Sequence, residues 1–158
     1  MKSLFQCLSL LVILLFSGSG AYAADSSTCA KDDEFQAMHV RALQSELMVA
    51  ALSCDLKDKY TDFAMSHSDV IKSSDRILKS YFKRSSSKDA DEMRNNFITG
   101  LANYASNLSL TMPRGEYCKA SHDYFDYVQY ADPKDVAKSV NKRYYEWHDG
   151  VKPCGNKS

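Results

Sequence analysis

The sequence predicts an all-α protein, a bundle of four to five helices with a central apolar first helix, held together by disulfides. Three observations lead to this expectation. Apolar residues recur with helical spacing over most of the chain after residue 23. No alternating apolar and polar run bounded by turn residues indicates a strand. An even number of cysteines follows residue 23, namely Cys29, Cys54, Cys118 and Cys154.

Residues 1–23 have the features of a cleaved signal peptide of bacterial type. Lys2 gives a positive start, an apolar stretch runs from Leu4 to Phe16, and Ala21-Tyr-Ala23 is a small-x-small cleavage pattern. The stretch is too short for a stable membrane span. We therefore expect residues 24–158 to form a single helical domain, exported to the periplasm and without a transmembrane span after cleavage. Cys29 lies too far beyond the cleavage position for a lipid anchor.

The charge balance points to no particular class of partner. The chain has 20 basic and 20 acidic residues. Such a balance gives no global basic field for nucleic acid or for an anionic membrane. We therefore do not expect nucleic acid as a partner.

The first helix is expected over residues 32–53. From Ala42 to Leu52 its apolar residues project almost all round the helix. A helix that is apolar on every side is surrounded by other helices. We therefore expect Leu47, Met48 and Val49 to be buried although they face different directions.

Four further helices are expected, at residues 58–82, 89–108, 116–130 and 132–148. The first three each carry one apolar stripe, the pattern of a helix packed on one side. The start of the last is marked by Asp132, a good N-cap residue, and by Pro133, which suits the first helical position. Gly150 and Pro153 follow its expected end.

The geometry of the helix ends favours one cysteine pairing of three. Cys29 and Cys54 flank a helix about 30 Å long, whereas a disulfide needs Cα atoms within about 7 Å. In an up-and-down path, Cys54 and Cys118 lie at the same end of the bundle, which leaves Cys29 to pair with Cys154. The last helix must then be short, bent or laid across the bundle. The cysteines lack the close pairs of a zinc site and the motif for covalent haem.

One long segment carries a family resemblance. The run Arg41-Ala-Leu-Gln-Ser-Glu-Leu-Met-Val-Ala-Ala-Leu-Ser-Cys54, followed by Leu101-Ala-Asn103, Ala105-Ser106 and Tyr117-Cys118, resembles an uncharacterised family of small exported proteins of alphaproteobacteria. The match covers residues 41–128. It implies periplasmic export and a Cys54–Cys118 pair, and it implies no activity.

Polar residues within the apolar segments are candidates for buried pairs or for a pocket. Arg41, Gln44 and Glu46 lie on the first helix, and a buried charge must be paired or hydrogen-bonded. In the structural interpretation, Gln44 or Glu46 meets Asn103 or a helix end inside the bundle. In the functional interpretation, these side chains line a ligand pocket.

The residues that carry chemistry do not form a catalytic or metal-binding pattern. The four histidines include no pair at i, i+4 on one helix, and Ser121-His-Asp123 are adjacent residues that do not converge on a helix. No phosphate-binding loop or nucleophile motif is present. We therefore expect neither an enzyme nor a protein that holds a cofactor or metal.

Tyrosines gather in the last third of the chain. Tyr127, Tyr130 and Tyr145 fall off the main apolar stripes, and tyrosine is favoured at protein interfaces. The sequence thus favours an exported binding or interaction module for another envelope protein. A carrier of a small apolar ligand, with a cavity between helices, is the alternative.

Overall fold

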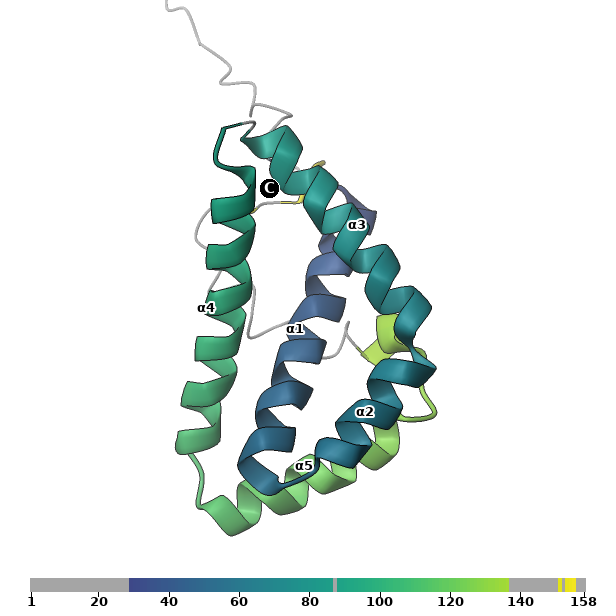
Figure 1. Ribbon diagram of the computed structural model, residues 1–158, viewed down its shortest axis with the longest axis vertical. Coiled ribbons are helices and arrows are strands. Elements are labelled where there is room, and N and C mark those ends of the chain that lie inside the picture. Colours follow the sequence, from purple (N-terminus) through teal and green to yellow (C-terminus); the bar gives the residue numbers. More distant parts are fainter. Residues whose placement is uncertain (1–28, 87, 137–150, 152, 156–158) are drawn as a thin grey trace, which may run out of the picture.

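Helix α1 (Asp32–Cys54) is the axis of the molecule (Figure 1). The computed structural model describes residues 29–86, 88–136, 151 and 153–155. Acidic residues in the first turn favour the positive end of the helix dipole, and the backbone N–H of Lys31 donates to Glu34 Oε2 at 2.8 Å. The helix ends at Asp55, which has a left-handed φ of 59° and donates its N–H back to the Ala51 carbonyl.

Within the described residues, four more helices with defined bounds pack around α1. They are α2 (Lys57–Ser66), α3 (Ser68–Ser85), α4 (Ala90–Leu110) and α5 (Arg114–Val128). Helix α1 contacts each of them, most extensively α3 and α4, which also pack against each other. Helix α5 lies across the C-terminal end of α1 (Figure 1). The all-α class is confirmed: within the described ranges no strand occurs, and the one isolated bridge joins Ala30 to Pro153.

The expected single helix over residues 58–82 is two helices, which corrects the sequence prediction. His67 has φ −109° and ψ 20°, outside the helical region. Its N–H still bonds the Phe63 carbonyl at 3.0 Å, so the chain bends with little loss of hydrogen bonding. Asp69 lies in the first turn of α3, where an acidic residue favours the positive end of the helix dipole. The bend directs α2 along α5 and α3 along α1.

The core confirms the central position of α1 but not its complete enclosure. Leu43, Leu47 and Val49 are buried, as expected. Met48 is 36 % exposed and Leu52 is 65 % exposed, so the prediction that Met48 is buried is wrong. With the half-buried Arg41 and Gln44, these two residues follow helical spacing and form one stripe of α1 that its neighbours leave partly open.

Two disulfides tie both ends of α1 to distant parts of the chain. Cys54 at its C-terminal end bonds Cys118 of α5, and Cys29 just before its N-terminal end bonds Cys154. The Cα atoms are 5.3 Å and 5.0 Å apart respectively, within the ordinary range. Arg114, the first residue of α5, also donates to the Ser53 carbonyl at 3.3 Å. The pairing is the one that the helix ends favour.

The last expected helix is described only at its start. Asp132 caps it as predicted: its Oδ1 accepts from the Lys134 N–H at 2.8 Å, and its carbonyl accepts from Val136 at 3.1 Å. The expected helical residues 137–148 lie outside the described residues. Across the part of the chain that is described, no helix is long and apolar enough to cross a membrane.

Candidate ligand-binding pocket

A pocket of about 390 Å³ opens where α1, α4 and α5 meet. This volume lies in the range of small-molecule sites. Each helix supplies residues from one face, at the spacing of successive turns. The described lining residues are Glu46, Leu47 and Ala50 of α1; Ala105 and Leu108 of α4; Met112 of the following turn; and Tyr117, Ala120, Ser121 and Tyr124 of α5.

Among the described lining residues, the wall is apolar apart from one carboxylate and three hydroxyls. Glu46 is the single charged residue among the described residues that line it. Small side chains at Ala50, Ala105 and Ala120 leave the space open, because larger residues there would fill it. Such a wall suits an apolar ligand body with a few polar contacts.

The electrostatics place Glu46 close to both tyrosines of the wall. Burial raises the pKa of the Tyr117 and Tyr124 hydroxyls above the ordinary value for tyrosine, and the negative charge of Glu46 adds to both shifts. The Tyr124 hydroxyl is enclosed and has no hydrogen-bond partner among the described residues. The pocket therefore combines a carboxylate with two aromatic rings and a hydroxyl that has no hydrogen-bond partner among the described residues.

The predicted polar residues do not meet inside the bundle as expected. Asn103 is exposed, which corrects its assignment as a buried partner. Gln44 is half-buried and bonds Tyr60 of α2, its Nε2 donating to the hydroxyl at 3.3 Å. Arg41 Nη1 in turn donates to Gln44 Oε1 at 2.5 Å. Of the α1 polar residues, Glu46 is the one that lines the pocket.

The tyrosines predicted to form a partner surface lie at and beyond the end of α5. Tyr127 is 60 % exposed and Tyr130 is 87 % exposed. Tyr145 lies outside the described residues. Asp126 beside them pairs with Lys59 of α2, and the hydrogen bond from Lys59 is the main reason that the pKa of Asp126 is below its ordinary value. The two rings therefore stand next to a charged surface.

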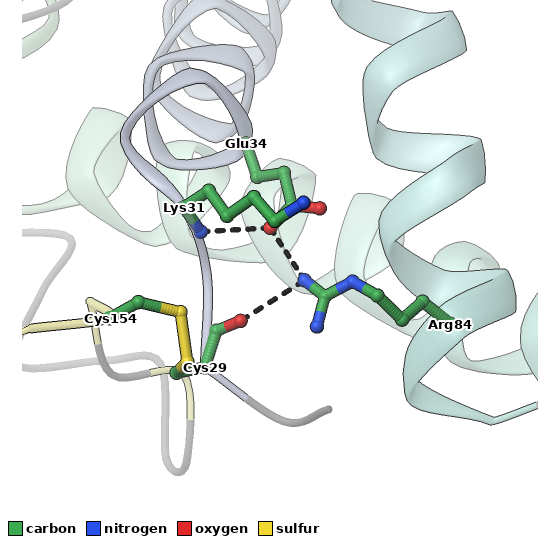
Figure 2. Close-up of a disulfide and its surroundings, with 5 residues drawn as sticks. All are labelled: Cys29, Lys31, Glu34, Arg84 and Cys154. Carbon is green, nitrogen blue, oxygen red and sulfur yellow. Dashed lines mark hydrogen bonds and ion pairs between the residues drawn. A yellow bond between two sulfur atoms is a disulfide. The ribbon is translucent and has the colours of Figure 1, made fainter. Parts of the chain in front are cut away.

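A second polar cluster ties α3 to the start of α1, at the Cys29–Cys154 disulfide (Figure 2). Glu34 is 6 % exposed and accepts from Arg84 Nη2 at 2.6 Å. Arg84 Nη2 also donates to the Cys29 carbonyl at 3.1 Å. Sequence reasoning missed this pair, because Glu34 looks like an ordinary first-turn acid. The cluster therefore links the last turn of α3 to the first turn of α1.

The histidines and acids of the described residues form no metal-binding group. Within the described ranges, no three His, Cys, Asp or Glu residues are placed to hold a metal ion. His67 packs its ring on Phe63, with centroids 5.1 Å apart, and its Nε2 has no hydrogen-bond partner in the described part of the chain. His122 faces Asp126 at 3.5 Å on the exposed side of α5.

The sequence analysis did not connect Tyr117 and Tyr124 with Glu46. Their spacing of seven residues, with Ala120 and Ser121 between them, is the one local signal of a shared wall. The pocket depends on the register of three helices, which no single segment reveals.

Comparisons with family models, with curated proteins and with solved structures found no match to this chain. Its function is therefore argued from the site itself.

Proposed function

We propose that the chain is a non-enzymatic binding protein, exported to the bacterial periplasm, that holds a small and largely apolar molecule between α1, α4 and α5. The observation that carries this proposal is the open pocket of about 390 Å³ with its mostly apolar wall. Export is supported by the signal-like residues 1–23 and by two disulfides, which persist in oxidising compartments. The resemblance to small exported alphaproteobacterial proteins agrees with this location.

A fluorescent apolar probe tests the proposal. N-phenyl-1-naphthylamine is neutral and brightens in apolar surroundings, so saturable binding to the purified disulfide-bonded protein is expected. Ala120→Phe should abolish it, because Ala120 is exposed on α5 and lines the pocket, where a phenyl ring occupies the space.

The matched control is Lys119→Phe, which places the same ring on the neighbouring exposed residue outside the wall. This variant should bind the probe as the wild type does. Absence of saturable binding to the wild type, or equal binding by Ala120→Phe, would contradict the proposal.

A second candidate function is docking to another envelope protein through Tyr127 and Tyr130. The observation in its favour is the exposure of two large rings next to the Lys59–Asp126 pair. Replacing both by Ser should leave the thermal midpoint nearly unchanged and should weaken capture of a periplasmic partner. Identical partners for wild type and double variant would remove this function from consideration.

A further inference from the structure

The exposed side of α3 carries a continuous basic stripe. Four positions of this helix are four, three and four residues apart, and this spacing places them on one line along a helix. At 1.5 Å per residue, the line is about 16 Å long. All of its residues are exposed and positively charged: Lys72, Arg76, Lys79 and Lys83. The overall balance of 20 basic and 20 acidic residues conceals this stripe.

The four charges are not used inside the molecule. None of them has an ion pair or a side-chain hydrogen bond with another of the described residues. The two acids of α3 lie beside the stripe and not on it. Asp69 is in the first turn of the helix, and Asp75 Oδ1 faces Arg94 Nη2 of α4 at 3.9 Å. The basic side chains are therefore available to a partner outside the chain.

The opposite side of α3 is fixed in the core. Leu78, Tyr81 and Phe82 are buried, and α3 packs against both α1 and α4 (Figure 1). The helix cannot turn its apolar side toward a partner without opening this core. A contact through the stripe therefore depends on charge, and it needs a partner with an extended negative surface.

The composition of the stripe favours a lipid surface over a protein. Three of its four residues are lysines. Lysine is depleted in protein interfaces, whose centres consist mainly of apolar and aromatic side chains. A membrane of anionic lipids attracts lysine and arginine without shape complementarity, and each such residue contributes roughly a fivefold factor in affinity. A straight row of cations is suited to the closely spaced phosphates of such a membrane.

We propose that α3 docks the protein on an anionic phospholipid surface through Lys72, Arg76, Lys79 and Lys83. The helix lies flat on the headgroups and does not insert, because its apolar side is buried in the bundle. This docking is separate from ligand binding between α1, α4 and α5, and neither depends on the other. An exported protein, as proposed above, meets such a surface at the membrane that it has crossed.

Vesicle flotation of the full disulfide-bonded protein tests this docking. At low salt, vesicles with one third phosphatidylglycerol should bind the protein at least about tenfold more strongly than vesicles of phosphatidylcholine alone. Salt at about 0.5 M should abolish the binding, because it screens exposed charges. The double variant Lys79→Gln, Lys83→Gln should bind the anionic vesicles at least about tenfold more weakly than the wild type.

The matched control is the double variant Lys57→Gln, Lys119→Gln. It removes the same number of exposed positive charges at the C-terminal end of α1, next to the Cys54–Cys118 bond, and should bind as the wild type does. Absence of binding to anionic vesicles, equal binding to both vesicle types, or equal losses in the two double variants would overturn the proposal.

A soluble polyanion distinguishes the lipid surface from an acidic protein. Saturable binding of poly-L-glutamate by a wild-type protein that binds no vesicles would assign the stripe to an acidic protein and would overturn docking on lipid. The comparison of the two vesicle types uses the wild type alone. It therefore decides the question even if a variant does not fold.

Discussion

Tyr124 shows how one side chain can serve a site at the expense of stability. Its hydroxyl is enclosed and has no hydrogen-bond partner among the described residues. A buried hydroxyl without a partner costs about 1–3 kcal/mol relative to one that is satisfied. Tyr117 shares the same wall. Burial raises its pKa as well, but a hydrogen bond with Ser121 lowers it in part. Removing the hydroxyl oxygen of Tyr124 is therefore the most informative single-atom change in this wall.

We expect Tyr124→Phe to leave the free energy of unfolding unchanged or to raise it by up to about 1–3 kcal/mol, because the substitution removes a polar atom that has no hydrogen-bond partner among the described residues. Urea denaturation measures this. The control is Tyr60→Phe, whose hydroxyl accepts from Gln44 and whose loss should cost about 0.5–1.5 kcal/mol. A Tyr124→Phe protein that is less stable than Tyr60→Phe would show that the hydroxyl is satisfied after all.

Glu46 should be visible in the alkaline titration of its neighbours. Burial is the larger cause of the raised pKa of Tyr117 and Tyr124, and the charge of Glu46 adds to it. Glu46→Gln should therefore lower both pKa values, as followed through the chemical shift of each ring carbon Cζ. Tyr81 is the internal control: its pKa is also raised by burial, but Glu46 is not among the causes. A change in the pKa of Tyr81 as large as that of Tyr124 would indicate a general loosening of the fold.

The same tyrosines fix the direction of a pH effect. Raised pKa values mean that the folded protein keeps its protons where the unfolded chain loses them, above the ordinary value of 10.0. Their contribution to stability is fully present below pH 10 and decreases as the pH rises beyond it. A free energy of unfolding that increases as the pH rises above 10 would contradict the burial of these rings.

At the scale of the element, α1 has a buried side and a narrow open stripe. Leu47→Ala should cost about 2–5 kcal/mol, because Leu47 is 1 % exposed and its removal leaves a cavity in the core. Leu52→Ala makes the same change on the same helix where the side chain is 65 % exposed, and should cost less than about 0.5 kcal/mol. Denaturant midpoints of the two variants measure the difference. Equal losses would remove the distinction between the two sides of α1.

The helices were predictable from sequence to the extent that their ends carry local signals. The start of α1 at Asp32 follows from its acidic first turn, and the cap at Asp132 forms as expected. The bend at His67 was not predictable from periodicity, because Phe63, Val70 and Ile71 continue one apolar stripe across it without Gly or Pro. Helix α2 contacts α1 and α5, and α3 contacts α1 and α4, and contacts between segments so far apart leave no local signal in the sequence.

The candidate site was predictable only in part. The sequence singled out Glu46 as a polar residue in an apolar helix and left open whether it pairs internally or lines a pocket. The answer depends on which residues of α4 and α5 face it, and that is a property of packing between helices distant in the chain. Asn103 failed as a partner for the same reason, since the register of α4 turns it outward. Met48 is exposed because the described neighbours of α1 leave one stripe of this helix open.

The whole molecule is organised by two disulfides that act on opposite ends of one helix. A helix of 23 residues is about 35 Å long, so the bonds at Cys54 and Cys29 restrain parts of the chain that cannot touch each other directly. The Cys54–Cys118 bond also fixes α5 across the end of α1, next to the pocket wall at Tyr117. Loss of either bond should therefore affect stability, but loss of Cys54–Cys118 should affect the pocket more.

We expect the double variant Cys54→Ala, Cys118→Ala to lose about 2–5 kcal/mol of unfolding free energy, because the bond closes a loop with a sequence separation of 64 residues. The Cys29–Cys154 bond closes a longer loop, with a sequence separation of 125 residues, and the double variant at these two positions opens it. Loop entropy grows slowly with length, so this second loss should be larger by only about 0.6 kcal/mol. Where both variants are folded, naphthylamine binding should fall in the variant that lacks Cys54–Cys118. It should persist in the variant that lacks Cys29–Cys154. A first variant with wild-type stability and binding would show that packing alone holds α5 and the pocket in place.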